Sequence, residues 1–429
     1  MSTNRKMGLW EAVAIAVGTM IGASIFSVFG LGARIAGHNL PLVFVFSGLL
    51  ALLVAYSYSH LGARLVSNAG PMEFILRGLG DNVLTGALSV LTWLTYVVSI
   101  ALFAKGFAGY FLPLAGLPDT ALASGLVEAG IIAAFTALNF LGSKAVGQAE
   151  FVIVLIKVAV LGVFVVLGVW SVRPDWIKPV FDTAHATHFL DATAVFFLSY
   201  MGFGLVTNAS EDIEDPGRNV PRAIYLSILI VTLIYVAVAV VAVGNLPLDE
   251  LQKAQDFALA EAARPFLGSF GYVLVSVGAL FSIASAMNAT LYGGANIAYA
   301  LAREGQLPEL FERKAWFSTP EGLYLTAGLG LLFALLFNLN GIASITSAVF
   351  MVIYLFVLWS HYRLVDQYGG NRAFILFSFI VVLVVFGVLM HYQWQTNRSA
   401  FYTTWVCFAA SVLVEAVYRG VTRRVLVVR

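Results

Sequence analysis

The chain has 429 residues, of which 60% are hydrophobic and 11% are charged, and its formal net charge is +1. Soluble domains carry about 25% charged residues, so this composition is typical of an integral membrane protein. No basic stretch is long enough to bind a nucleic-acid backbone, and the single cysteine, Cys407, excludes an internal disulfide and a cysteine-based metal cluster. We expect the Cys407 thiol to be packed within the last apolar run.

Apolar runs of membrane-spanning length recur from end to end. They predict an all-α membrane protein with twelve transmembrane helices, near residues 9–35, 40–66, 82–111, 122–141, 146–171, 189–212, 221–243, 269–299, 322–338, 341–363, 373–391 and 400–419. With the N-terminus in the cytoplasm, sixteen Lys and Arg residues fall inside and seven outside, which is the positive-inside bias. We therefore expect a multi-pass protein of the cell (plasma) membrane with both termini cytoplasmic. The outside segment 246–266 has charges at helical spacing and is predicted to be one amphipathic surface helix.

The first and sixth predicted spans carry glycine and polar residues at their centres, in GTMIGASIF at 18–26 and SYMGFG at 199–204. A broken helix in lipid is tolerated only where its freed backbone groups line a cavity. Freed carbonyls bind an ammonium and freed amides bind a carboxylate, so two facing breaks suit both ends of a zwitterion. Close helix packing is the alternative use of such glycines. Interrupted segments at matching places in two halves of a chain favour a transporter site.

The fifth predicted span contains a lone charge, Lys157, in FVIVLIKVAVLGVFVVLGVW at 151–170. A charge at membrane depth requires a partner, a water path or a function. Burial favours the neutral form of an amine, so Lys157 is a candidate proton carrier. The alternative is that it extends its charge to the near surface, because it lies only about 10 Å along a helix from Glu150. In the eighth span, Ser282 and Ser285 belong to a stripe of small residues that either packs or offers oxygens to Lys157.

Five segments carry a resemblance to a known family. They are GLWEAVAIAVGTMIGASIF at 8–26, SNAGP at 67–71, ALNFLGSKAVGQAEF at 137–151, FFLSYMGFGLVTNASEDIEDPGRNVPRAI at 196–224 and FSIASAMNATLYGGAN at 281–296. Together they resemble the amino acid–polyamine–organocation (APC) transporter superfamily. The chain is most similar to the proton-coupled archaeal and bacterial branch of the type called ApcT, over nearly its whole length.

The resemblance implies one transmembrane transporter domain with a LeuT-like 5+5 inverted repeat and unwound first and sixth helices. The first repeat is expected at 1–180, the second at 181–365 and two additional helices at 366–429. It implies secondary active, proton-coupled transport of amino acids by alternating access. Lys157 then takes the place of a sodium ion and contacts the Gly18 carbonyl and Ser282 or Ser285.

The resemblance also implies where the substrate binds. The expected carboxylate-binding groups are the amides of Gly22, Ala23 and Ser24, next to Ile21. The expected amine-binding groups are the carbonyls of Met20, Leu198, Ser199 and Met201, with the aromatic ring of Phe203 over the site. Because Ala23 stands where some relatives have Ser or Thr, a hydroxyl contact to the carboxylate comes from Ser24 or is absent. The pocket between the breaks and spans three, eight and ten has no evident charge besides Lys157, which favours small or medium neutral amino acids.

Other functions remain open from the residues. A membrane enzyme needs a nucleophile and base or a metal, and only His185 and His188, near Asp182 and Asp191, approach metal-ligand spacing; we expect them to be surface histidines. A channel would need a filter or a charged ring, which nothing here resembles. Sodium coupling, or exchange of amino acids or polyamines, is the third alternative, although the charge of Lys157 repels a cation. We expect no enzyme activity, metal or cofactor; the partners are an amino acid, a proton and the lipid bilayer, and the oligomeric state stays open.

Overall fold

The computed structural model describes residues 6–67, 69–139, 144–180, 182–303, 307, 309–311, 313 and 321–422. Within these residues the regular structure is helical, apart from one isolated backbone bridge between Met7 and Ile213. Ten segments are long and apolar enough to cross a membrane, and the described chain contains two shorter apolar helices, Leu9–Met20 and Gly322–Leu336. The chain is therefore a multi-pass membrane protein, while the count of twelve spans stays a prediction.

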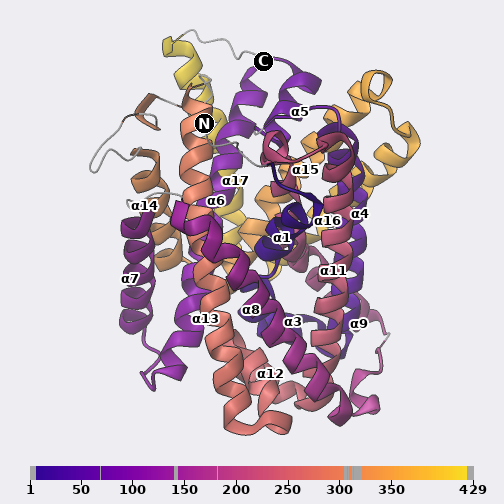
Figure 1. Cartoon of the computed structure of the whole chain (residues 1–429), viewed down its shortest axis with the longest axis vertical. Helices are drawn as coiled ribbons and strands as arrows, with labels where there is room; N and C mark the ends of the chain where they lie inside the picture. The colour runs from indigo at the N-terminus through magenta and orange to yellow at the C-terminus, as the bar shows by residue number, and fades with distance from the viewer. Residues whose placement is uncertain are drawn as a thin grey trace.

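The helices run up and down between two ends of the molecule, with α5 at one end and α12 at the other (Figure 1). In chain order, with η for a short 3-10 helix, they are α1 Leu9–Met20, α2 Ala23–Phe26, α3 Phe29–Ala36, η1 Gly37–Asn39, α4 Leu40–Gly62, α5 Pro71–Leu79, α6 Val83–Leu114, α7 Ala121–Asn139, α8 Lys144–Gly168, η2 Val169–Ser171, η3 Pro174–Ile177, α9 Thr183–Phe196, η4 Phe197–Gly204, α10 Leu205–Asn208, η5 Ser210–Asp212, α11 Pro216–Asn245, α12 Leu248–Ala254, η6 Gln255–Phe257, α13 Ala258–Arg303, η7 Glu309–Phe311, α14 Glu321–Leu336, α15 Leu339–Tyr368, α16 Arg372–Thr396 and α17 Arg398–Thr422. Helix α13 is interrupted at Gly268, where φ is +60°.

Helix α1 lies at the centre of the bundle, although it is one of the shortest of the apolar helices (Figure 1). It packs against α8, α11 and η4. The most apolar 18-residue stretches of α6 and α15 are 83% buried, whereas that of α7 is only 11% buried. Helices that are apolar all round and buried form the core, and apolar helices left exposed face the lipid. The interrupted helices are thus enclosed by the rest of the fold.

The predicted single surface helix over 246–266 is wrong. Helix α12 ends at Ala254, Gln255 takes a positive φ of 45°, and η6 leads into α13 at Ala258. The turn is wedged between two helices, because a Cβ at Gly30 of α3 would lie 2.0 Å from the Gln255 carbonyl oxygen. On the other side, a Cβ at Gly109 of α6 would lie 2.5 Å from the Asp256 side chain. This packing overrides the helical charge spacing.

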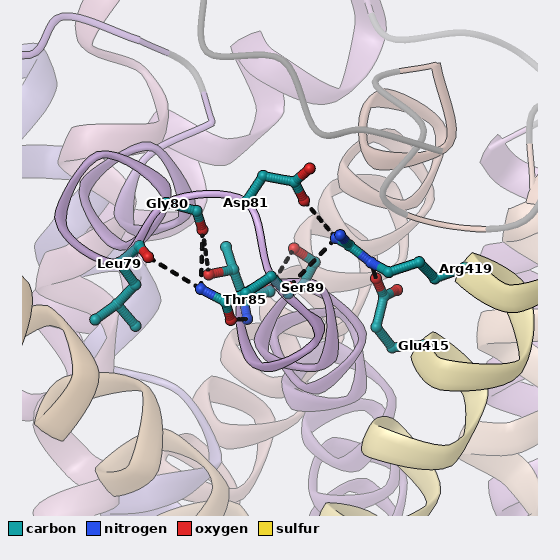
Figure 2. Close-up of polar contacts among 8 residues, drawn as sticks. Leu79, Gly80, Asp81, Thr85, Ser89, Glu415 and Arg419 are labelled. Atoms are coloured by element: carbon teal, nitrogen blue, oxygen red, sulfur yellow. Dashed lines mark hydrogen bonds and ion pairs between the residues drawn. The ribbon is translucent and has the colours of Figure 1, made fainter. Parts of the chain in front are cut away.

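Helix α17 is joined to the start of α6 by a polar cluster (Figure 2). The guanidinium of Arg419 bonds to the Asp81 carboxylate, and its Nε donates to Glu415 Oε1 at 3.1 Å, as the i, i+4 spacing of Glu415 and Arg419 on one helix favours. The Glu415 side chain is 1% exposed and lies against Gly86, where a Cβ would come within 2.1 Å of its carboxyl group. The expected packing of Cys407 in the same helix is confirmed as well, since the residue is buried.

Candidate functional site

The first and sixth predicted spans are both interrupted where their glycines lie. Helix α1 ends at Met20 and α2 begins at Ala23, which leaves Ile21 and Gly22 outside either helix. In the sixth span, α9 passes into the 3-10 helix η4 instead of continuing as an α-helix. A 3-10 stretch within a longer helix often marks a functional hinge or a strained sequence.

The two interruptions touch each other. A Cβ at Gly202 of η4 would lie 2.8 Å from the Met20 backbone nitrogen and 3.0 Å from the Thr19 Cβ. Only glycine, which lacks that atom, allows η4 to approach α1 so closely. The sequence segments 18–26 and 199–204 therefore meet in space, which is the arrangement that two facing breaks require.

Lys157 of α8 lies beside the break in the first span. Its side chain is fully buried, and its Nζ donates to the Gly18 carbonyl oxygen at 2.5 Å. That carbonyl belongs to the last turn of α1, where the helix dipole is negative and favours a cation. The interpretation in which Lys157 extends to the membrane surface is wrong, because the packed α1 and α13 cover it.

Ser282 of α13 completes this side of the break. Its hydroxyl donates to the Ile21 carbonyl oxygen at 2.9 Å. Ser285 lies one turn further along α13 and is also buried. Lysine and serine thus bind carbonyls three residues apart in the interrupted span, and both come from helices outside it.

A cavity of about 120 Å³ lies on the opposite side of the breaks. Five of the sequence-predicted substrate residues line it, namely Met20, Gly22, Ser24, Leu198 and Met201. Three others, Ile21, Ser199 and Phe203, are buried but are not among its described lining residues. Ala23 begins α2, and its side chain lies outside the described residues.

Helix α6 supplies a row of hydroxyls to this cavity that sequence reasoning missed. Thr92, Thr95 and Ser99 line it and donate to carbonyls of their own helix at 2.8, 2.6 and 2.7 Å. Each hydroxyl hydrogen is thereby used, so the oxygen lone pairs remain available to the cavity. Their i, i+3, i+7 spacing on one helix face is a signal that the sequence carried.

The rest of the described lining is aromatic or neutral. It consists of Thr19, Tyr58, Pro71, Tyr96, Leu102, Phe103, Gly202, Gly204, Leu205, Asn208, Thr290, Thr346, Phe350, Ile353 and Tyr354. Among the described lining residues none is Asp, Glu, Lys or Arg. The third, eighth and tenth predicted spans contribute to the lining through α6, α13 and α15, as expected from the sequence. Tyr58 of α4 and Pro71 of α5 also line the cavity, which was not expected.

A tyrosine of α11, which no sequence signal indicated, lies behind the two breaks. The hydroxyl of Tyr235 donates to the Met20 carbonyl oxygen at 2.5 Å and lies 3.4 Å from the Ser199 carbonyl oxygen. The Ser24 hydroxyl also donates to the Met20 carbonyl, at 2.9 Å, and lies 3.2 Å from the Tyr235 hydroxyl. Tyr235 is fully buried, so these contacts are shielded from water.

Two larger cavities open at the ends of the molecule. The one at the α5 end, of about 950 Å³, shares Tyr96, Leu205 and Asn208 with the central cavity. The one at the α12 end, of about 1000 Å³, has none of the described lining residues of the central cavity. The described lining residues therefore show that the central cavity adjoins the cavity at the α5 end.

The mouth at the α5 end is polar. Arg77 donates from Nε to Glu73 Oε1 at 2.5 Å, and this hydrogen bond raises the pKa of Arg77. The guanidinium therefore stays charged at every physiological pH. At the other end of the molecule, His185 bonds to Asp182 at 2.7 Å on the surface. No group of three metal-ligating side chains occurs among the residues that the structure describes.

Comparison with known proteins shows the family to which the chain belongs. Residues 7–415 match the amino acid permease family. The chain is 61% identical to the uncharacterized protein MJ0609 of Methanocaldococcus jannaschii, over 98% of this chain and 97% of that one. It is 34% identical to the inner membrane transport protein YbaT of Escherichia coli, over 98% and 97%. It is 27% identical to the methylthioribose transporter of Bacillus subtilis, over 97% and 94%. The chain therefore belongs to the amino acid permease family of membrane transporters, and it is not an enzyme.

Proposed function

We propose that this protein is a proton-coupled transporter of small neutral amino acids, working by alternating access, with Lys157 as the proton carrier. The observation that carries the proposal is the fully buried Lys157 ammonium at 2.5 Å from the Gly18 carbonyl, beside the break in the first span. A cation at that position attracts the negative end of the α1 dipole and so holds α8 against α1. A change in its charge therefore acts directly on the interrupted helix.

Loss of the proton from Lys157 would weaken this attachment. A neutral amine still donates to Gly18, but it no longer interacts with the helix end as a full charge. A shift between two conformations requires a differential interaction of a few kcal/mol, and a charge in a low-dielectric site provides energies of that size. Protonation then favours the conformation in which α1 and α8 are fastened together, and deprotonation favours their separation.

The substrate is proposed to bind where the two breaks border the central cavity. The amides of Gly22, Ala23 and Ser24 would bind its carboxylate, with the Gly22 amide leaving the Met20 carbonyl to which it donates at 2.9 Å. The carbonyls of Leu198 and Met201 in the sixth span would bind its amine, in exchange for contacts such as the 3.3 Å hydrogen bond from Tyr354 to Met201. The lining residues that the structure describes are uncharged, which supports a neutral side chain. The volume of about 120 Å³ supports a small one, since pockets for drug-sized ligands measure about 300–1,000 Å³.

The cavity arrangement supports a conformation that faces one side of the membrane. Because the described lining of the central cavity shares residues with the α5-end cavity and none with the α12-end cavity, we infer that the substrate path leads toward the α5 end. The positive-inside bias assigns the α5 end to the cytoplasm. We accordingly propose an inward-facing conformation in the plasma membrane, with both termini cytoplasmic.

Uptake into proteoliposomes tests the coupling. An imposed pH gradient, without sodium, should drive accumulation of a labelled neutral amino acid, whereas a sodium gradient without a pH gradient should not. Lys157→Ala should abolish the pH-driven accumulation but retain exchange of internal for external substrate, because the cavity does not include Lys157. Lys253→Ala, at an exposed residue of α12 paired with Asp249, is the matched control and should behave as the wild type.

Two results would contradict the proposal. One is proton-driven accumulation by Lys157→Ala that matches the wild type. The other is accumulation driven by sodium alone. A panel of labelled solutes should include cationic amino acids and methylthioribose, the latter because the Bacillus relative is named for it. Preferential transport of a cationic amino acid or of methylthioribose would contradict the assignment of the substrate.

A further inference from the structure

We propose that the Tyr235 hydroxyl holds the interrupted first and sixth spans at a fixed separation and so positions the backbone of the central cavity for substrate. Tyr235 is a positioning residue in this proposal, because it is not among the described residues that line the cavity. The inference rests on the proposed function to the extent that the substrate binds between the two breaks. It does not depend on proton coupling.

The Met20 carbonyl, at the end of α1, accepts hydrogen bonds from several groups of the protein. Its oxygen accepts hydrogen bonds from the Tyr235 hydroxyl at 2.5 Å, the Ser24 hydroxyl at 2.9 Å and the Gly22 amide at 2.9 Å. A carbonyl oxygen has two lone pairs, so three donors saturate it. This carbonyl is therefore engaged by the protein in the present conformation, and its direction is set by α11.

The Tyr235 hydroxyl also lies close to the sixth span. The same hydroxyl oxygen lies 3.4 Å from the Ser199 carbonyl oxygen of η4, so one side-chain atom lies between the two interruptions. The phenol ring that carries it is fixed on both sides by aromatic contacts, with Phe44 at 5.1 Å and Tyr200 at 5.7 Å between ring centroids. Tyr235 itself is fully buried. A rigid, dry ring with its hydroxyl between two backbone segments defines their spacing.

The distance between the two interruptions affects the shape of the central cavity. Met20 lines the cavity from the first break, and Leu198 and Met201 line it from either side of Ser199. A shift of α1 relative to η4 would therefore move opposing parts of the cavity wall. Binding that depends on several backbone groups at once is sensitive to such shifts, because the substrate would have to order the wall as it binds.

The experiment compares Tyr235→Phe with Tyr392→Phe. Both substitutions remove one hydroxyl from a buried ring, but the Tyr392 hydroxyl of α16 donates at 3.3 Å to the side chain of Asn340 in α15, and neither residue belongs to an interrupted span. KM and Vmax are measured by exchange of labelled for unlabelled substrate in proteoliposomes without any gradient, and thermal unfolding checks that each variant is folded. Exchange without a gradient keeps this test separate from that of Lys157.

We expect Tyr235→Phe to raise KM about tenfold with Vmax within twofold of the wild type, the size of effect that follows from one lost buried hydrogen bond. Tyr392→Phe should change KM by less than twofold, and both variants should keep the pH dependence of the wild type. An unchanged or lowered KM for Tyr235→Phe would overturn the proposal, as would an equal rise for Tyr392→Phe.

A second variant covers the case in which Tyr235→Phe does not fold. Incorporation of 3-fluorotyrosine at position 235 retains the ring and the hydroxyl, and the fluorine makes that hydroxyl a stronger hydrogen-bond donor. KM should then stay within twofold of the wild type or fall. A rise in KM for a hydroxyl that donates more strongly would contradict the positioning role.

Discussion

Gly202 offers the sharpest test of how closely the two interrupted spans must approach. A methyl group at this position would lie 2.8 Å from the Met20 nitrogen and 2.9 Å from the Met20 Cγ, whereas ordinary contact begins at 3.4 Å. The nearest atom belongs to the backbone and cannot move by a change of rotamer. Gly202→Ala should therefore push η4 away from α1.

The cost follows from the packing. Inserting a methylene-sized group into a packed core costs about 1–3 kcal/mol. Replacing glycine by alanine within a helix returns about 0.5–1 kcal/mol, because alanine loses less conformational freedom on folding. The middle of each range leaves about 1.25 kcal/mol of strain. If this strain falls on the substrate-bound conformation, KM should rise about eightfold, since 1.36 kcal/mol corresponds to a factor of ten.

The assay is substrate exchange in proteoliposomes together with thermal unfolding in detergent. Gly130→Ala is the matched control, because nothing lies within 4 Å of a Cβ there and α7 has little buried surface. That control should keep its KM and unfold at an equal or higher temperature. If Gly202→Ala retains both the KM and the unfolding temperature of the wild type, the two breaks do not require the close contact described above.

Two polar pairs give further expectations for stability. The Lys105 ammonium lies 2.8 Å from the fully buried Glu128 carboxylate. Lys105→Met should lower the free energy of unfolding by about 3–5 kcal/mol, because it leaves the charge of Glu128 buried without a partner cation. Glu128→Gln removes that buried charge and should lower the free energy of unfolding by less. Equal thermal unfolding of the two variants would contradict this reasoning. Arg419→Gln removes the ion pairs to Asp81 and Glu415. We expect α17 to pack less firmly against α6, which would be measured as faster hydrogen exchange in α17 at unchanged KM. Unchanged hydrogen exchange in α17 would show that the ion pairs in Figure 2 do not hold the two helices together.

The positions of the breaks were predictable from the sequence because their physical cause is local. Glycine at positions 18, 22, 202 and 204 weakens a helix wherever it stands, and in lipid that weakness matters only beside a cavity. Lys157 was likewise visible as a single charge in an apolar run. Whether Lys157 is buried or reaches the surface was not predictable from the sequence, because it depends on which helices cover α8.

Tyr235 shows what the sequence does not carry. It is one of 17 tyrosines and stands in an apolar helix whose other residues give no sign of a polar partner. Its partners are 215 and 36 residues away in the chain, so only the tertiary fold brings them together. The turn at Gln255 was mispredicted for the same reason, because the helices α3 and α6 that shape it lie far away in sequence.

The buried lysine has a consequence for the medium in which the protein works. A positive charge that is part of the polypeptide has the same occupancy at every salt concentration, whereas a dissolved metal ion leaves its site on dilution. The contact between α1 and α8 should consequently survive in fresh water and in brine alike. This contact is held by the polypeptide itself and needs no dissolved mineral to maintain it.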